Sequence, residues 1–162
     1  MARVVSINIS ARKGVQKAPV PEAELTVNWG IQGDAHAGNW HRQVSFLGQE
    51  SIDKMTALGI PGLHSGDFAE NITTEGIILY DLPVGTYFRI GPVLFKVTQI
   101  GKECHQHCAI YKIVKDCVMP REGIFAVVLE GGIIRPGMDL EIIPAPASSA
   151  VPAIRNLKDS SE

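Results

Sequence analysis

Residues 98–117, which read TQIGKECHQHCAIYKIVKDC, contain all three cysteines of the chain and two of its five histidines. Cys104 and Cys108 stand four residues apart with two histidines between them, and Lys102 lies just before them. A thiolate is the form of cysteine that reacts and binds metals, and a neighbouring cation lowers the pKa of a thiol. The residue types around Cys104 therefore indicate an activated sulfur. The alternative is a small buried side chain with inert sulfur, which suits polar surroundings less well.

The same cluster can also be interpreted as a zinc site. The candidate ligands are Cys104, His107, Cys108 and Cys117. Structural zinc sites usually carry paired CxxC or HxxxH knuckles separated by a loop, and this chain has no such pairs. The run CHQHC therefore indicates zinc only weakly, and Cys108 and Cys117 could instead pack among the apolar residues near them.

A second group of polar residues occupies residues 28–39, NWGIQGDAHAGN, and continues to Arg42. Glycines in such a loop allow main-chain amides to approach an anion, and Arg42 can donate two parallel hydrogen bonds to a phosphate or carboxylate. This pattern indicates an anion-binding loop. In the alternative, Asp34 and His36 only satisfy the hydrogen bonds of a structural turn.

A third polar group lies in residues 66–76, GDFAENITTEG. Asp67, Glu70 and Glu75 could act as paired acids in general acid/base catalysis. A turn followed by a strand explains Asp67 and Asn71 equally well. We favour the structural interpretation for this segment.

The composition bounds the class of protein. A formal charge of −2 gives no overall attraction to nucleic acid, and no apolar run approaches the roughly 18 residues that span a bilayer. The start, MARVVSINIS, lacks the features of a secretory signal, and an odd number of cysteines favours reduced thiols. We expect a soluble cytoplasmic protein that binds neither nucleic acid nor membrane. Fingerprints for a Rossmann site, a P-loop or a nucleophile elbow are absent from the sequence.

Short runs rich in β-branched and aromatic residues, separated by glycine and proline, dominate the chain. The expected strands are residues 4–9, 71–74, 86–90, 93–99, 124–129 and 139–143. Few helical patterns lie between them, which favours a mainly β fold with an antiparallel or mixed, barrel-like sheet and a few short helices.

One helix is expected at residues 49–58. Its apolar residues Ile52, Met55 and Leu58 recur every three positions, and a glycine and a proline follow them. Pro19 and its neighbours can form only a loop or an edge strand. We expect a single domain over residues 1–143 and a flexible tail over residues 144–162, where prolines and serines show no periodicity.

Taken in order, four blocks of the sequence resemble the MOSC domain family, named for the C-terminal domain of molybdenum-cofactor sulfurases. The blocks read NWGIQGDAHAG with HRQVSFL, SGDFAENITTEGI with LPVGTYFRIG, VTQIGKECHQHCAIY, and CVMPREGIFAVVLEGGIIRPG. The resemblance covers residues 1–143. In character the chain is similar to the small stand-alone bacterial members, or to those fused to molybdopterin-adenylylating partners, because the large aminotransferase-like sulfurase domain is absent. Pyridoxal phosphate is therefore not expected.

The resemblance implies a barrel-like β fold that handles the molybdenum cofactor, molybdopterin, or its tungsten analogue. The signature cysteine of the family falls on Cys104, and in relatives this cysteine ligates molybdenum or carries a persulfide. Cys108 could share or replace this role, because enzymatic members have a single cysteine in this run. The candidate cofactor contacts are His36, Arg42, Asn71, Lys102 and His105, of which Lys102 and His105 would tune the ionisation of Cys104.

The favoured hypothesis is therefore an intracellular module that binds a molybdopterin-type cofactor and handles its sulfur or metal through Cys104. We expect residues 33–42, 66–71 and 101–108 to converge on one pocket. The chain shows no flavin, haem or iron–sulfur ligand pattern, so sulfur transfer or molybdenum-dependent activity would require a partner, from cofactor biosynthesis or a molybdoenzyme. The alternatives are a non-enzymatic storage module for molybdate, tungstate or the cofactor, and a zinc-stabilised structural domain.

Overall fold

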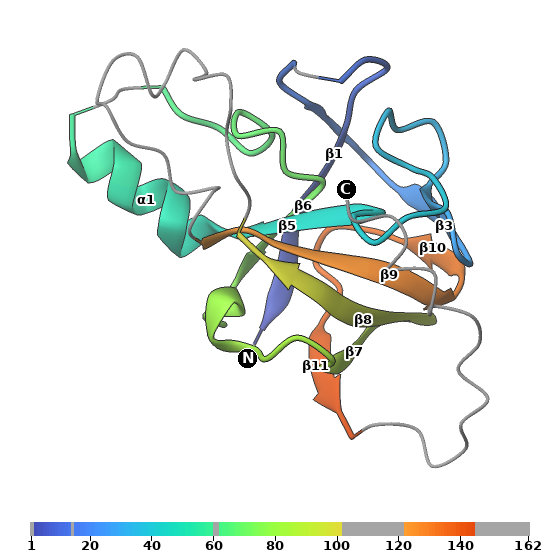
Figure 1. Cartoon of the computed structure of the whole chain (residues 1–162). Helices are drawn as coiled ribbons and strands as arrows, with labels where there is room; N and C mark the ends of the chain where they lie inside the picture. Colours follow the sequence, from blue (N-terminus) through green and yellow to red (C-terminus); the bar gives the residue numbers. More distant parts are fainter. Residues whose placement is uncertain (1, 14, 60–61, 102–121, 145–162) are drawn as a thin grey trace.

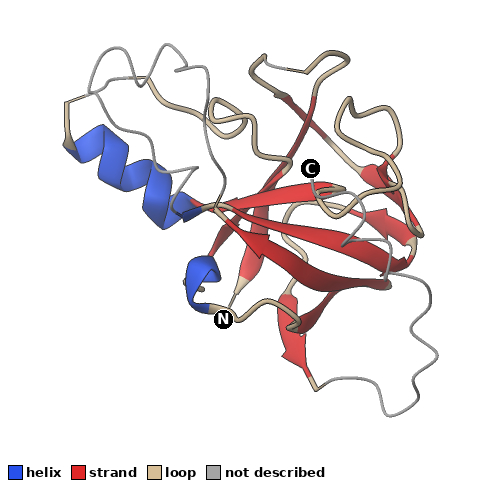
Figure 2. Cartoon of the chain, viewed as in Figure 1, coloured by secondary structure: helices blue, strands red, loops and turns tan. Residues whose placement is uncertain are grey.

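The computed structural model describes residues 2–13, 15–59, 62–101 and 122–144, and strands are the main regular element among them (Figure 2). Their elements are β1 (Arg3–Ile9), β2 (Ala18–Val20), β3 (Ala23–Thr26), β4 (Gly30–Ile31), β5 (Val44–Gly48), α1 (Gln49–Ala57), β6 (Ile72–Glu75), a 3-10 turn η1 (Leu79–Asp81), β7 (Tyr87–Ile90), β8 (Val93–Ile100), β9 (Ile124–Glu130), β10 (Gly132–Ile134) and β11 (Leu140–Ile143). The mainly β fold expected from the sequence is confirmed.

The strands form two sheets (Figure 1). The larger has the order β11-β7-β8-β9-β5-β6-β1-β2, and the smaller has the order β10-β3-β4. Strands β5 and β6 pair in parallel while the other pairs are antiparallel, so the sheet is mixed, as predicted. A single bridge between Arg3 and Asp139 brings the chain before β11 back against β1. The larger sheet therefore curls on itself, but among the described strands it does not close into a complete barrel.

The core is built around three phenylalanines from neighbouring strands. Phe46, Phe88 and Phe95 are fully buried. Phe46 meets each of the other two rings edge-on at 5.3 Å between centroids, while Phe88 and Phe95 stack at 5.1 Å. Such pairs contribute about 0.5–1.5 kcal/mol beyond the burial of their area. This cluster fixes β5 against β7 and β8.

The helix predicted at residues 49–58 is confirmed as α1, Gln49–Ala57. Ile52 and Met55 are buried, as their spacing predicts. Leu58 instead follows the helix and is 60% exposed, because it caps the helix and no longer lies on the buried face. The helix begins directly after β5, so the two elements form one continuous segment.

Six strands expected from the sequence are confirmed with end points that differ by one or two residues: β1, β6, β7, β8, β9 and β11. Pro19 lies in β2, which is an edge strand of the larger sheet. The expected tail lies outside the described residues from position 145 onward.

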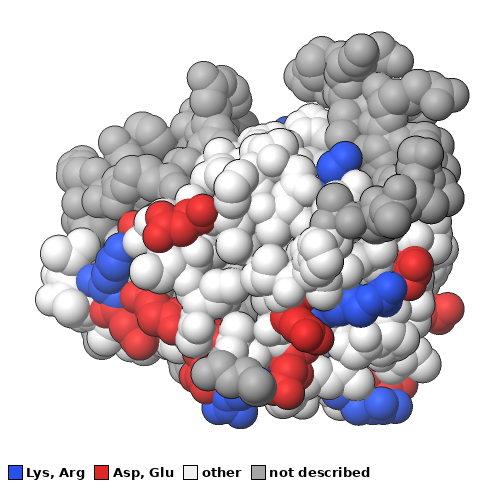
Figure 3. All heavy atoms as spheres, turned by 90° about the horizontal axis from the view of Figure 1, so that it is seen from below, with Lys and Arg blue, Asp and Glu red and all other residues white. Residues whose placement is uncertain are grey.

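Charges of both signs are interspersed on the face seen in Figure 3. Two of the ion pairs among the described residues are Arg89 with Glu130 at 2.8 Å and Arg135 with Glu22 at 3.1 Å. Within the described part of the chain, no helix combines the length and apolar character needed to cross a bilayer.

Three loops meet at one end of the larger sheet, in the upper part of Figure 1. Ile7 of β1 and Phe46 of β5 both pair with Ile72 of β6, and β1 runs antiparallel to β6 while β5 runs parallel to it. The end of β1 and the starts of β5 and β6 therefore lie side by side. This register brings together the loops at residues 10–17, 32–43 and 62–71.

Candidate functional site

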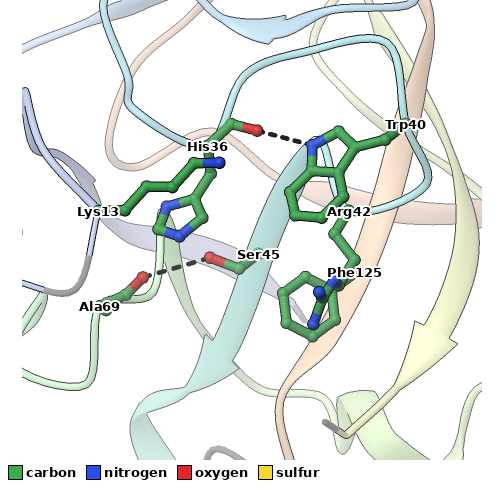
Figure 4. Close-up of a pocket in the computed structure, with 7 residues that line it drawn as sticks. All are labelled: Lys13, His36, Trp40, Arg42, Ser45, Ala69 and Phe125. Carbon is green, nitrogen blue, oxygen red and sulfur yellow. Dashed lines mark hydrogen bonds between the residues drawn. The ribbon is translucent and has the colours of Figure 1, made fainter. Parts of the chain in front are cut away.

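The loops enclose a cavity of about 300 Å³, a volume at the lower end of the range for small-ligand pockets. We call it the Arg42 pocket. Its lining residues, shown in Figure 4, are Lys13, His36, Trp40, Arg42, Ser45, Ala69 and Phe125. They come from the loop after β1, the loop before β5, β5 itself, the loop before β6, and the start of β9. The pocket thus depends on the sheet register for its shape.

Arg42 lies against two aromatic rings of the pocket. Its guanidinium carbon is 4.8 Å from the ring centre of Trp40 and 5.7 Å from that of Phe125. Such contacts hold a guanidinium in place and contribute about 0.5–1 kcal/mol each at partly exposed sites. The Nε atom of Arg42 is buried and has no hydrogen-bond partner in the described part of the protein. Buried donors are nearly always paired, so an unpaired nitrogen beside the pocket is unusual.

The pocket carries positive charge. The Nζ of Lys13 lies 5.5 Å from the ring centre of Trp40, and Arg42 contacts the same ring. None of the described lining residues is acidic. Asp34, a buried carboxylate two positions before the lining residue His36, is neutralised by an ion pair with Lys17. The pocket therefore favours an anionic ligand group.

Behind His36 lies a buried ion pair that the sequence does not suggest. The side chains of Lys17 and Asp34 are fully buried, and Lys17 Nζ lies 2.8 Å from Asp34 Oδ1. The Asp34 carboxylate also accepts hydrogen bonds from the amides of Ser10 and His36, at 3.1 Å and 3.0 Å. These contacts tie the loop after β1 to the loop that carries His36.

Asp34 is ionised in the folded protein. Burial opposes ionisation of Asp34. The hydrogen bond and charge attraction from Lys17 outweigh this effect, together with hydrogen bonds from the amides of His36 and Ser10. The pKa of Asp34 is therefore below its ordinary value. A carboxyl whose pKa is lowered by folding contributes stability above its unfolded pKa, near 3.9, and loses it as the pH falls through the folded-state pKa. This contribution is therefore constant across neutral pH.

Asn71 lies behind the pocket wall. It is fully buried, and its Oδ1 accepts hydrogen bonds from the amide and the hydroxyl of Ser45, at 3.0 Å and 3.2 Å. The Asn71 amide group donates to the carbonyl of Asn8 at 3.2 Å. Asn71 thus holds β5 and β1 together at the pocket and fixes Ser45, which lines it.

The acids of residues 66–76 do not form a common site. Asp67 accepts a hydrogen bond from the amide of His64 at 2.8 Å, in a turn. Glu75 pairs with Arg3 on the exposed surface. Glu70 is fully buried. The structural interpretation of this segment therefore describes the observed contacts better than paired acid/base catalysis does.

Glu70 is a buried carboxyl whose two oxygens differ in their hydrogen bonds. Its Oε2 accepts hydrogen bonds from the Gly66 amide and the Thr73 hydroxyl, both at 2.8 Å, whereas Oε1 has no partner among the described residues. Burial raises the pKa of Glu70 above its ordinary value, although these hydrogen bonds oppose the shift. The folded state therefore binds this proton more tightly than the unfolded chain does. The free energy of unfolding falls as the pH rises from about 4.3 to the folded-state pKa.

Glu70→Gln is expected to flatten this pH dependence. Glutamine keeps an oxygen for Gly66 and Thr73 but cannot ionise, so the variant should match the wild type within about 1 kcal/mol at pH 4.5 and exceed its stability by about 1–3 kcal/mol at pH 8. Urea unfolding at both pH values measures the difference. Glu75→Gln is the control, because its exposed pair contributes little. Parallel stability curves for wild type and Glu70→Gln would contradict the assignment.

Of the site residues predicted from sequence, the structure brings two into the Arg42 pocket. His36 and Arg42 both line it, and Asn71 lies behind it. The remaining predicted residues, Lys102, Cys104, His105 and Cys108, lie outside the described residues, as do the further zinc candidates His107 and Cys117. Among the described side chains, no three His, Cys, Asp or Glu residues group as metal ligands do.

Besides Ser45 of β5, the sequence interpretation missed four residues of the site: Lys13, Lys17, Trp40 and Phe125. Trp40 stands two positions before Arg42, and an aromatic residue near an arginine is a signal for a cation–π contact. The other three carry no local signal. His41 lies next to Arg42 in sequence but bonds Gln99 of β8 through its ring, at 2.8 Å.

Comparison with known proteins agrees with this fold. YuaD from Bacillus subtilis is 17% identical with a TM-score of 0.74, over 88% of this chain and 96% of that one. YiiM from Geobacillus stearothermophilus is 20% identical with a TM-score of 0.67, over 95% and 80%. YiiM from Escherichia coli is 19% identical with a TM-score of 0.66, over 91% and 72%. Curated protein sequences gave no match.

At these identities the structural likeness concerns the fold alone. The sequence itself matches the MOSC domain over residues 33–141, more than half of the chain. This range includes His36, Arg42 and the strands that carry the pocket. The chain belongs to the MOSC domain family.

Proposed function

We propose that this protein binds a molybdopterin-type cofactor, containing molybdenum or tungsten, and that the Arg42 pocket holds an anionic group of that cofactor. The observation that carries the proposal is the guanidinium of Arg42, whose Nε has no hydrogen-bond partner among the described residues and which lies beside two aromatic rings in a pocket lined by cations and by no described acid. Membership of the MOSC family supports the choice of cofactor.

The residues present fit such a group. Arg42 presents an unused donor, and a guanidinium binds phosphate oxygens through paired hydrogen bonds. Lys13, an exposed residue at the pocket, adds a second positive charge. Trp40 and Phe125 provide apolar area beside these cations. When bound, the cofactor would supply a metal centre for redox or atom-transfer chemistry, while Arg42 and Lys13 would bind and orient its anionic end.

In this proposal Cys104 is the sulfur carrier or metal ligand, Cys108 is its candidate substitute, and Lys102 and His105 favour the thiolate. A nearby cation lowers the pKa of a thiol and so favours the thiolate, and the residue types adjacent in sequence provide one. Delivery or use of the sulfur would involve a partner from cofactor biosynthesis or a molybdoenzyme.

Arg42→Gln is expected to reduce retention of the cofactor more than tenfold, because a charge-assisted hydrogen bond to a desolvated anion is lost. The fold should survive, since the aromatic contacts of Arg42 contribute only about 0.5–1 kcal/mol each. Molybdenum content and pterin fluorescence of the purified variants measure retention, and thermal unfolding measures folding.

Arg89→Gln is the matched control. Arg89 pairs with Glu130 on exposed strands, and Glu130 lies five residues along β9 from the pocket residue Phe125, ~17 Å away. This variant should retain the cofactor as the wild type does. Equal retention by Arg42→Gln and Arg89→Gln would contradict the proposal. Binding of molybdate without pterin, lost in Arg42→Gln alone, would instead favour the storage module.

Cys104→Ser is expected to abolish persulfide labelling or molybdenum retention with almost no change in thermal stability, because serine replaces cysteine within a run of polar residues and changes little in size. Cys117→Ser should keep both. A zinc-stabilised domain gives a different result, since loss of any ligand removes folding free energy that the metal supplies. All cysteine variants would then melt early and lose zinc together.

A further inference from the structure

Trp40 is held at the Arg42 pocket by two hydrogen bonds. Its indole Nε1 donates to the carbonyl of His36 at 2.9 Å, and its backbone amide donates to the carbonyl of Gly38 at 3.0 Å. Both partners belong to the loop before β5. The position of the indole ring is therefore set by this loop.

Two cations lie around this one ring. The guanidinium carbon of Arg42 is 4.8 Å from the ring centre, and the Nζ of Lys13 is 5.5 Å from it. Lys13 comes from the loop after β1, whereas Arg42 comes from the loop before β5 (Figure 4). The negative faces of an aromatic ring attract cations, so the indole brings together two like charges from different loops.

Neither cation is neutralised by an acid within the described part of the chain. The described lining residues include no acid, and no described carboxylate forms an ion pair with Lys13 or Arg42. Other described cations do pair with carboxylates, namely Arg3, Lys17, Lys54, Arg89 and Arg135. The two charges at Trp40 are therefore available to an anion that enters the pocket.

We propose that Trp40 gathers Lys13 and Arg42 around its ring, and that this pair of cations makes the Arg42 pocket selective for dianionic over monoanionic ligand groups. The attraction between charges scales with their product, so each cation attracts a dianion twice as strongly as a monoanion at the same distance. A dianion also loses more hydration on binding, and the second cation offsets this larger loss. Trp40 is a positioning residue, whereas Lys13 and Arg42 contact the ligand.

A phosphate monoester is the dianionic group of this class. Its second pKa is about 6, so it carries nearly two negative charges above neutral pH, whereas a phosphodiester or a sulfate ester carries one. The inference rests on the proposed function and narrows the anionic group of the cofactor to a phosphate monoester.

The first test compares methyl phosphate with methyl sulfate as probes at pH 8, by isothermal titration calorimetry on the wild-type protein. The two probes have nearly the same shape and differ in charge. Methyl phosphate is expected to bind at least tenfold more tightly. Equal affinities, or no binding of either probe, would overturn the proposal. This comparison requires no variant to fold.

Lys13→Met tests the need for two cations. The variant keeps Arg42, so the preference for methyl phosphate should fall below about threefold, while the affinity for methyl sulfate changes less. Lys96→Met is the matched control, because Lys96 lies 5.6 Å from the ring centre of Tyr87 and does not line the pocket. An unchanged preference in Lys13→Met would overturn the role of the second cation.

Two substitutions test the role of the indole. Trp40→Leu removes the aromatic face and should reduce the preference for methyl phosphate as Lys13→Met does. Trp40→Phe keeps an aromatic face and should recover most of the preference, although it loses the hydrogen bond to His36. General damage to the pocket would weaken both probes equally and leave their ratio unchanged. The same ratio in Trp40→Leu and the wild type would therefore overturn the positioning role.

The inference and the proposed function can fail separately. A wild type that prefers methyl phosphate but retains no pterin would refute the proposed function and leave the selectivity of the pocket standing. A wild type that retains the pterin cofactor but binds the two probes equally would refute this inference alone.

Discussion

Lys17→Met is expected to lower the free energy of unfolding by about 3–5 kcal/mol at neutral pH. The substitution keeps most of the apolar stem but removes the ammonium that pairs with Asp34, and both side chains are fully buried. A carboxylate left alone in such a site has neither water nor a counter-ion. Urea unfolding measures the loss.

Two controls separate this effect from the general loss of a lysine. Lys54→Met removes an ammonium that is 53% exposed and pairs with Glu122, so its cost should be far smaller than that of Lys17→Met. Lys17→Met/Asp34→Asn should recover most of the stability that Lys17→Met loses. If Lys17→Met and Lys54→Met lost equal stability, the buried pair would contribute no more to folding than an exposed pair does.

The cost of Lys17→Met should also depend on pH in a defined direction. Burial raises the pKa of Asp34, and without Lys17 only the amides of His36 and Ser10 counteract this effect. The pKa of Asp34 should therefore rise in the variant. Protonation then removes the unpaired charge. The difference between wild type and variant should therefore shrink as the pH is lowered from 7 towards 4.

Gly66→Ala is expected to cost about 3 kcal/mol or more, because two effects add at this position. Gly66 adopts a φ of +90°, a backbone conformation that residues with a side chain rarely adopt. An added Cβ would also lie 2.2 Å from the carbonyl oxygen of Lys17. The Lys17 amide also donates to the Gly66 carbonyl at 2.9 Å. The two backbones would have to separate, so the substitution should also disturb the Lys17–Asp34 pair.

Gly85→Ala is the matched control, since Gly85 has a similar φ of +99° and nothing within 4 Å of an added Cβ. It should cost only the conformational strain, about 1–2 kcal/mol. The difference between the two variants in thermal or urea unfolding isolates the close approach to Lys17. Similar losses for both would show that the backbone at Gly66 yields easily.

The parts of the fold that could be predicted are those with a strong local pattern. The strands β1, β8 and β9 are runs of β-branched and apolar residues, and α1 has three-residue apolar spacing with a clear end. Strand β5 was not predicted, although all five of its residues are buried. It is short, lacks alternation because it is buried on both faces, and runs directly into α1. Strands β3, β4 and β10 are shorter still and depend on pairing with distant partners.

The site shows the same division between local and distant information. His36 and Arg42 were predicted because their residue types and loop setting suit anion binding. Lys17 could not be, because its sequence neighbours give no hint that it pairs with Asp34 across seventeen positions. Asn71 was predicted as a cofactor contact, whereas its observed hydrogen bonds hold Ser45 and join two strands. Such contacts depend on the register of the sheet, which places Asn71 beside Ser45 of β5 and Asn8 of β1.

The most direct test of the proposed function is the metal and pterin content of the wild-type protein, produced with and without added molybdate. Elemental analysis and pterin fluorescence of the same sample would be compared per protein chain. The account predicts that molybdenum and pterin are retained together in equal amounts, and that both fall in Arg42→Gln. Protein that carries stoichiometric zinc and no pterin, even when molybdate and cofactor are supplied, would contradict it.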